Sequence, residues 1–134
     1  MLARLWMVSG ETAKAQPLLR HYTSNSILHR PFAEVSLAWS EAGHDPGNAV
    51  RRAERGFNQL KLMARGQFWP RFWLFYDAYA YGRTMDLAGQ PEKAGQGYQL
   101  CIELAPHSFL AERARQALAG LSKKTNTDST DPPV

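Results

Sequence analysis

Short phrases rich in glycine and proline interrupt the sequence at intervals that suit helices of about 10–20 residues. These breaks lie at residues 9–11, 42–48, 65–67, 88–91 and 105–108. Between them, apolar residues recur at the three- and four-residue spacing of a helix, and no long stretch alternates apolar and polar residues as a half-buried strand does. The chain is therefore predicted to be all-α, with about six to seven helices arranged in antiparallel hairpins.

Proline and serine residues mark where several of these helices are expected to begin. Pro46 and Pro91 each stand at an expected first helical position, where the missing N–H of proline costs nothing. Ser108 can cap the helix that follows it. The helix that starts at Pro46 is expected to reach about Ala64. Pro17 lies inside another helical segment and is expected to kink that helix or delay its start.

Three of the breaks are similar in sequence. They read SGETAKA at residues 9–15, AGHDPGNA at residues 42–49 and AGQPEKA at residues 88–94. Each phrase ends one helix with a glycine, opens the next helix, and reaches an alanine five or six residues later. Internal repetition of this kind is typical of proteins built from stacked helical hairpins.

The last phrase lies in a 34-residue window, residues 75–108, which resembles a tetratricopeptide repeat, a helix–turn–helix unit of that length. The matching positions are Tyr81, Gly82, Gly89, Ala94, Tyr98, Cys101 and Pro106. Small side chains at Gly82 and Ala94 would let two helices pack closely. The resemblance implies a short right-handed α-solenoid of such repeats, with residues 109–121 as a C-terminal closing helix.

One repeat domain, residues 1–121, is expected, followed by a polar tail at residues 122–134 whose single apolar residue is Val134. Such a tail cannot bury enough apolar surface to offset the entropy of ordering, so it is expected to be disordered. At the other end, Leu2, Leu5 and Trp6 are apolar, whereas the terminus of a solenoid normally carries a polar cap. This end is therefore expected to continue a longer array, or to meet a partner or a second copy of the chain.

In solenoids of the tetratricopeptide type, the first helices of successive units line a concave groove that holds peptides or partner helices. The resemblance assigns the following residues to that groove: Arg30, Ala33, Leu37, Tyr76, Tyr79, Arg83, Asp86, Leu110 and Arg113. It implies a non-catalytic protein-binding module or assembly scaffold whose partner is a peptide or a helix. The subclass that grips a C-terminal carboxylate is matched poorly, because only Arg83 stands at a suitable position.

Eight of the 15 aromatic residues fall within residues 68–81. Helical spacing assigns four of them to one core-facing stripe: Trp69, Phe72, Trp73 and Tyr76. Eight aromatic side chains cannot all face one way on a helix, so some are expected to be partly exposed, as at a binding surface. Tyr76 and Tyr79 are the residues for which we expect this exposure.

The net charge of +4 is carried by residues 45–74, which include Arg51, Arg52 and Arg55. A basic helix beside aromatic residues has the chemistry to bind RNA through phosphate pairing and base stacking. A solvated helix face explains the same pattern, and the charge is small for a nucleic-acid partner. RNA binding through this face is therefore kept as an alternative function, as is a self-assembling structural subunit.

Catalytic and metal-binding motifs are not found in the sequence. The four histidines are far apart and form no HExxH pair, and Cys101 is expected to be a buried, inert thiol. No glycine-rich loop suits a phosphate group, and no apolar run reaches the ~18–20 residues that span a bilayer. We therefore expect no enzymatic activity, cofactor, metal or membrane partner, and a cytoplasmic location.

Overall fold

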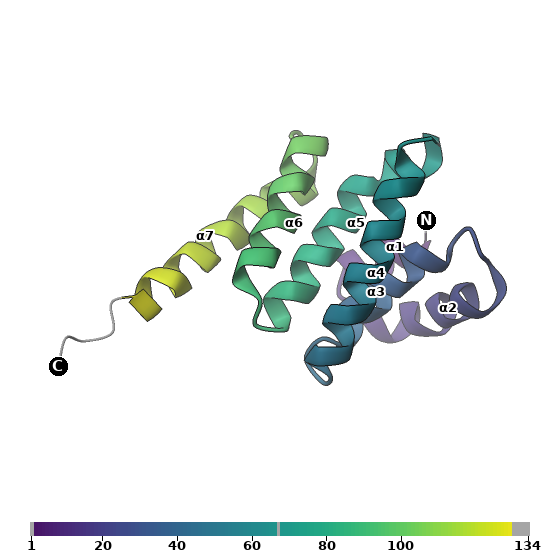
Figure 1. Ribbon diagram of the computed structural model, residues 1–134, viewed down its shortest axis with the longest axis horizontal. Helices are drawn as coiled ribbons and strands as arrows, with labels where there is room; N and C mark the ends of the chain where they lie inside the picture. The colour runs from purple at the N-terminus through teal and green to yellow at the C-terminus, as the bar shows by residue number, and fades with distance from the viewer. Residues whose placement is uncertain (1, 67, 130–134) are drawn as a thin grey trace.

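The computed structural model describes residues 2–66 and 68–129. All regular secondary structure in this part of the chain is α-helical, which confirms the all-α prediction. The helices are α1 (Leu2–Val8), α2 (Thr12–Asn25), α3 (Arg30–Glu41), α4 (Pro46–Ala64), α5 (Phe68–Leu87), α6 (Pro91–Leu104) and α7 (Phe109–Ser129). Figure 1 shows them in chain order, with α7 extending past the other helices toward the C-terminus.

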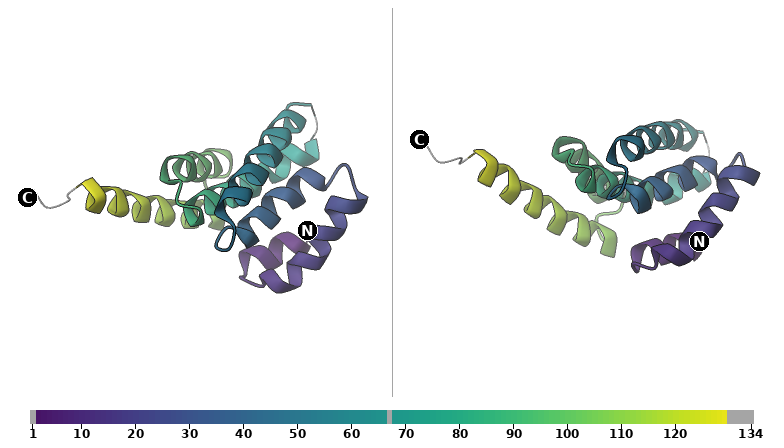
Figure 2. Two further views of the ribbon diagram at one scale, coloured as in Figure 1. Left: turned by 60° about the horizontal axis from the view of Figure 1, so that its bottom comes forward. Right: turned by 90° about the horizontal axis from the view of Figure 1, so that it is seen from below.

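Each helix packs against the next one in the chain, and the odd-numbered helices also pack against one another. The pairs α1–α3, α3–α5 and α5–α7 are in contact, in addition to every sequential pair. The central helices α3 and α5 have α4 and α6 on one side and α1 and α7 on the other (Figure 2). As a consequence, α3 and α5 are each contacted by four other helices, α5 by α3, α4, α6 and α7.

Two of the three related phrases form the same turn, at Gly10 and at Gly89. Both glycines have a positive φ, 84° and 77°, which L side chains adopt only with strain. In each turn the glycine N–H donates to the carbonyl three residues earlier, at 3.2 Å. The N–H of the next residue donates to the carbonyl five residues before it, at 2.7 Å after Gly10 and 2.8 Å after Gly89. This is the Schellman motif that ends a helix.

The middle phrase forms a different turn. The carbonyl of Glu41 accepts hydrogen bonds from the N–H groups of both His44 (2.9 Å) and Asp45 (3.0 Å). The Asp45 carboxylate then caps α4 by accepting from the N–H of Asn48 at 3.3 Å. Similar sequence phrases therefore lead to two turn geometries, separated by whether a glycine takes the left-handed conformation.

The α5–α6 hairpin is packed backbone to backbone at two glycines. A Cβ atom on Gly97 would lie 2.7 Å from the backbone nitrogen of Gly82, and one on Gly82 would lie 2.8 Å from the ring of Tyr98. Ala94 and Cys101 are fully buried on the same face of α6. Close packing at Gly82 is confirmed, with Gly97 as the partner that brings the two backbones together, and the predicted small residue Ala94 is buried.

Several helix boundaries agree with the sequence-based expectations. Helix α4 runs from Pro46 to Ala64, α6 begins at Pro91, and the Ser108 hydroxyl accepts the N–H of Ala111 at 3.1 Å at the start of α7. Pro17 lies inside α2, which already begins at Thr12. The expected delay of this helix is therefore wrong.

The last helix continues beyond the expected domain boundary at residue 121. Helix α7 reaches Ser129, whereas the sequence predicts a disordered tail from residue 122. Adding a residue to a helix that already exists adds one backbone hydrogen bond without a new nucleation cost, which favours such an extension. The remaining part of the predicted tail, residues 130–134, lies outside the described residues.

Candidate binding groove

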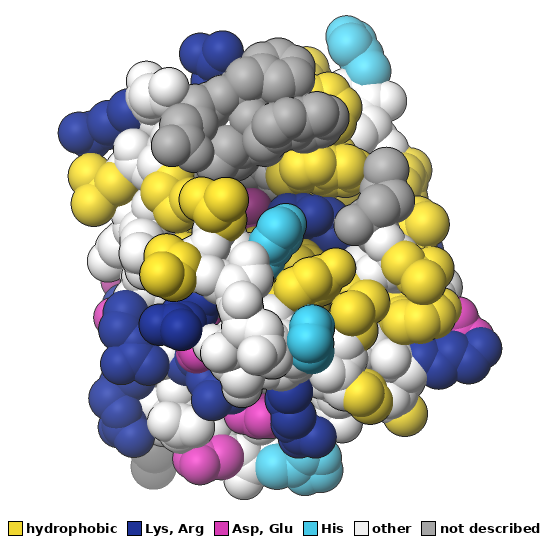
Figure 3. Space-filling model, turned by 90° about the vertical axis from the view of Figure 1, so that its right-hand side faces the viewer, with side chains coloured by type: hydrophobic (Ala, Val, Ile, Leu, Met, Phe, Trp, Pro, Cys, Tyr) yellow, Lys and Arg dark blue, Asp and Glu magenta, His cyan; other side chains and the backbone are white. Residues whose placement is uncertain are grey.

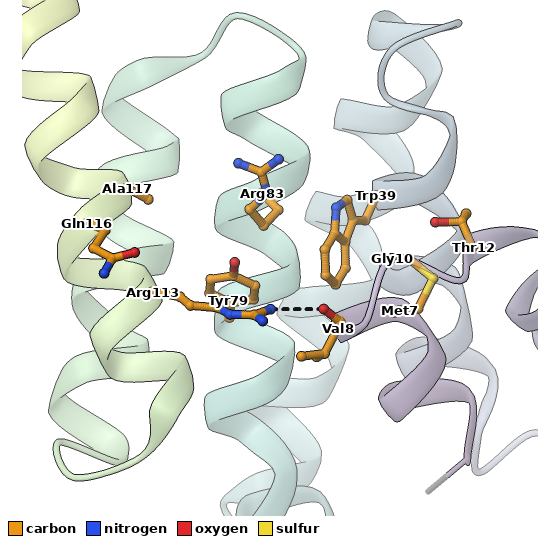
Figure 4. Close-up of a pocket in the computed structure, with 10 residues that line it drawn as sticks. All are labelled: Met7, Val8, Gly10, Thr12, Trp39, Tyr79, Arg83, Arg113, Gln116 and Ala117. Atoms are coloured by element: carbon orange, nitrogen blue, oxygen red, sulfur yellow. Dashed lines mark hydrogen bonds between the residues drawn. The ribbon is translucent and has the colours of Figure 1, made fainter.

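An open groove of about 600 Å³ lies where α1 and α7 approach each other beneath α3 and α5. Figure 2 shows this approach from below, and Figure 4 shows the residues that line the groove. They come from five helices, α1, α2, α3, α5 and α7, and from the turn after α1: Met7, Val8, Gly10, Thr12, Trp39, Tyr79, Arg83, Arg113, Gln116 and Ala117. The groove therefore forms only when both ends of the described chain are in place.

Two aromatic rings form the floor of the groove. Trp39 of α3 and Tyr79 of α5 meet edge to face, with ring centroids 5.8 Å apart and an interplanar angle of 81°. On its other side the Tyr79 ring lies 5.8 Å from the ring of Tyr98, a fully buried residue of α6. Contacts on both sides hold the Tyr79 ring in one orientation, so the floor is a preorganised apolar surface.

Two arginines supply the charge of the groove. Arg83 follows Tyr79 by one helical turn, and its guanidinium lies 3.7 Å from the Asp86 carboxylate. The Asp86 carboxylate also accepts a hydrogen bond from the Tyr98 hydroxyl at 3.0 Å. Arg113 reaches across from α7 and donates to the Val8 carbonyl at 2.8 Å, as the dashed line in Figure 4 shows. Because the lining residues include these two arginines and no carboxylate, the groove is suited to an anionic group.

The Arg113 hydrogen bond has a local reason in the end of α1. Val8 is the last residue of α1, and the final carbonyls of a helix have no partner within it. A cationic side chain at this position also complements the negative end of the helix dipole. Arg113 therefore stabilises the end of α1 while forming one rim of the groove.

Burial raises the pKa of the Tyr79 hydroxyl, and the positive charges of Arg83 and Arg113 partly oppose this rise. Burial raises the pKa of Tyr98 as well. Both phenols therefore stay protonated at neutral pH. The Tyr79 hydroxyl can donate a hydrogen bond to a ligand at the groove floor.

Three of the sequence-predicted groove residues are brought together here, namely Tyr79, Arg83 and Arg113. The expectation that Tyr76 and Tyr79 are partly exposed is wrong, because their side chains are 2% and 7% exposed. The physical reason is the central place of α5, whose sides are covered by four other helices. Tyr79 still presents part of its ring to the groove, whereas the Tyr76 hydroxyl is hydrogen-bonded to Ser36 inside the core at 3.0 Å.

The other predicted groove residues lie elsewhere. Leu37, Ala33 and Leu110 are buried in the core and do not line the groove. Arg30 is exposed at the start of α3 and donates to the Thr23 carbonyl at 2.9 Å. Asp86 is not among the residues that line the groove, and it forms an ion pair with Arg83, which is.

Seven of the ten residues that line the groove, Trp39 and Gln116 among them, are absent from the sequence-based set. Gln116 could have been found, because it follows Arg113 by three residues and helical spacing places both on one face. Trp39 has no comparable indication in the sequence. Its role depends on which face of α3 is left uncovered by α2, α4 and α5.

The predicted basic face on α4 is only partly available. Arg51 and Arg55 are exposed. Arg52 instead bridges two carboxylates of α3, with its Nε 2.8 Å from Glu34 and its Nη1 2.9 Å from Glu41. This network joins α3 to α4 and compensates the charge of Arg52.

Cys101 is buried, and burial raises the pKa of its thiol to about 11. The thiol is therefore protonated at neutral pH and weakly nucleophilic, as the sequence predicts. Within residues 2–66 and 68–129, no three His, Cys, Asp or Glu side chains gather to form a metal site. None of the helices in this part of the chain combines the length and apolar character that crossing a bilayer requires.

Comparisons with protein-family models, with curated proteins and with solved structures each find no match for this chain. The function of the groove must therefore be inferred from its own residues and geometry.

Proposed function

We propose that the protein is a non-catalytic binding module with a tetratricopeptide-like solenoid fold, which holds a peptide or helix of a partner protein in the groove. The observation that carries this proposal is the combination of an aromatic floor, Trp39 and Tyr79, with two arginines at its edge, Arg83 and Arg113. The repeated Schellman turns and the contacts between successive odd-numbered helices support the repeat interpretation.

The partner segment is expected to carry an apolar side chain and a carboxylate close together. The apolar side chain packs over Trp39 and Tyr79, which replace the buried Tyr76 and Leu37 as the anchor surface. The carboxylate pairs with Arg83 and Arg113, since charge-assisted hydrogen bonds to guanidinium groups are the strong ones. Complementary charge also favours acidic partners over basic ones.

A peptide array tests this proposal directly. The wild-type chain is incubated with peptides that pair one aromatic or aliphatic residue with Asp or Glu, and with the same peptides carrying Asn or Gln. We expect retention of the acidic set only, and loss of retention in an Arg83→Glu variant. An Arg55→Glu variant is the matched control, because Arg55 is exposed on α4 away from the groove. Equal binding by wild type and Arg83→Glu would refute the proposal.

A self-assembling subunit is the second candidate, supported by apolar side chains at the α1–α2 end. Leu2 and Leu5 are 50% and 55% exposed, and Ile27 and Leu28, in the loop after α2, are 79% and 67% exposed. Figure 3 shows apolar side chains scattered over this face among histidines and basic residues. Light scattering tests this candidate, with a mass above 15.1 kDa expected if the end pairs with a second copy. An oligonucleotide titration of the same sample tests the RNA alternative.

A further inference from the structure

The guanidinium of Arg4 is held against three aromatic rings. Arg4 lies on α1, and its guanidinium carbon is 3.9 Å from the ring centre of Phe32, 4.7 Å from that of Trp73 and 5.4 Å from that of Tyr76. Phe32 belongs to α3, and the other two belong to α5. A cation within about 6 Å of an aromatic face is attracted by the ring, most strongly where water is excluded. Three rings together form a cation-binding cage.

A buried carboxylate adjoins this cage. Asp77 follows Tyr76 on α5 and is fully buried, and neither of its carboxylate oxygens has a hydrogen-bond partner among the described residues. Burial raises the pKa of Asp77 to about 7, and the positive charge of Arg4 opposes this rise. A buried carboxylate without hydrogen-bond partners costs free energy. A cation that bonds to the Asp77 oxygens would therefore stabilise this group.

The pairing between Arg4 and Asp77 is incomplete on both sides. The Nε of Arg4 is also buried without a partner. A guanidinium can satisfy both oxygens of a carboxylate at once through two parallel N–H bonds. Arg4 attracts Asp77 through its charge but does not make this bidentate contact, since neither oxygen of Asp77 is bonded. The site can therefore form hydrogen bonds to a guanidinium, at the two oxygens of Asp77, that Arg4 does not form.

The helix that carries Arg4 is weakly attached. Helix α1 has seven residues, the fewest of any described helix, and exposes Leu2 and Leu5 to solvent. Its fully buried side chains are Ala3 and Met7. A short helix at one end of the described chain, with few buried side chains, opens locally at low free-energy cost.

We propose that Phe32, Trp73, Tyr76 and Asp77 form a receptor site for an arginine side chain of a partner protein, and that Arg4 is an internal occupant which this partner displaces. The site differs from the groove in its residues and in the sign of the charge that it accepts. The two sites are coupled through α1. Displacement of Arg4 detaches this helix, which also carries Val8, the acceptor of the Arg113 hydrogen bond.

The site can be tested by removing the internal occupant and supplying a small guanidinium in its place. In an Arg4→Ala variant we expect ethylguanidinium to raise Tm by about 3 °C at roughly three times its Kd. The rise should be much smaller in the wild type, where Arg4 competes, and absent in an Arg4→Ala/Asp77→Asn variant. Ethylurea, the uncharged analogue, should have no effect, and Arg20→Ala, which removes an exposed arginine of α2, is the matched control.

Hydrogen exchange on the wild-type chain gives a second measurement that does not depend on the folding of any variant. Ethylguanidinium is expected to speed the exchange of the α1 amides at least threefold, because it competes with Arg4, and to leave the α6 amides unchanged. Ethylurea should change neither helix. The proposal is overturned if α1 exchange is unaffected by ethylguanidinium, or if Arg4→Ala folds and shows the same Tm response as Arg20→Ala.

Discussion

The α5–α6 hairpin and the α1–α2 hairpin contain the same kind of turn, but their helices are fixed in the fold by different contacts. Both turns place a glycine at positive φ and make the same pair of backbone hydrogen bonds. In the α5–α6 hairpin the two backbones touch at Gly82 and Gly97, and the residues around them are buried. At the other end, α1 is held to the rest of the fold by two buried side chains, Ala3 and Met7, by the caged Arg4 and by the Arg113 hydrogen bond. The comparison shows that a local sequence phrase determines a turn, whereas tertiary partners determine how firmly the helices pack.

The largest expected effect on stability comes from a substitution in the α5–α6 hairpin, where the two backbones touch. A Gly97→Leu substitution places a Cβ 2.7 Å from the Gly82 nitrogen and 2.9 Å from the Ala78 carbonyl oxygen, which forces the backbones apart. We expect a loss of about 4 kcal/mol in the free energy of unfolding, measured by urea denaturation. Gly95→Ala is the control, because its Cβ would meet only Leu118 at 3.8 Å. An equal loss in the two variants would contradict the close packing.

At the α1 end, stability is expected to depend on pH through Asp77. Its folded pKa of about 7 lies above the ordinary value of 3.8, so the folded state binds this proton more tightly than the unfolded state. The contribution of this group to stability is complete below pH 3.8 and is lost as the pH rises through 7. Between pH 5 and pH 7 we expect Asp77→Asn to gain about 2 kcal/mol relative to wild type.

Urea denaturation of both proteins across this pH range provides the measurement. The difference between the wild type and Asp77→Asn isolates Asp77, because all other titrating groups are present in both. Parallel stability curves for the two proteins would show that Asp77 is not the group responsible.

The two similar turns should respond equally to the loss of glycine. Gly10→Ala and Gly89→Ala each force an L side chain into the left-handed region and should each cost about 1 kcal/mol of unfolding free energy. Gly43→Ala, in the turn of different geometry, should cost nothing, since no atom lies within 4 Å of its Cβ position. A much smaller loss at Gly10 would indicate that α1 is already detached in solution.

The smallest effect is expected at the Arg113 hydrogen bond. Arg113→Gln removes the guanidinium that donates to the Val8 carbonyl and should lower the free energy of unfolding by less than about 1 kcal/mol. Faster hydrogen exchange in α1, with unchanged exchange in α6, is the more sensitive readout. Arg115→Gln, on the same helix, is a suitable comparison because Arg115 bonds to Glu112 and to the Pro106 carbonyl, both of which are nearby in the sequence.

Helix boundaries were predictable from the sequence where they are determined by residues at the boundary itself. Pro46, Pro91 and Ser108 mark helix starts because proline and serine act within one turn of their own position. The groove was only partly predictable, since Tyr79 and Arg83 share a helix face but Trp39 and Val8 reach the groove from other helices. The burial of Tyr76 depends on how many helices surround α5, which no spacing within α5 indicates.

The hydrogen bond from Arg113 to Val8 joins residues that are 105 positions apart in the chain. Most other contacts connect helices that are adjacent or next but one, so they form over short loops and at low entropic cost. The Arg113 bond closes the largest loop and is therefore expected to form after the hairpins have packed. The groove is therefore complete only when both ends of the described chain have folded. A partly folded chain lacks the complete groove that a partner would bind.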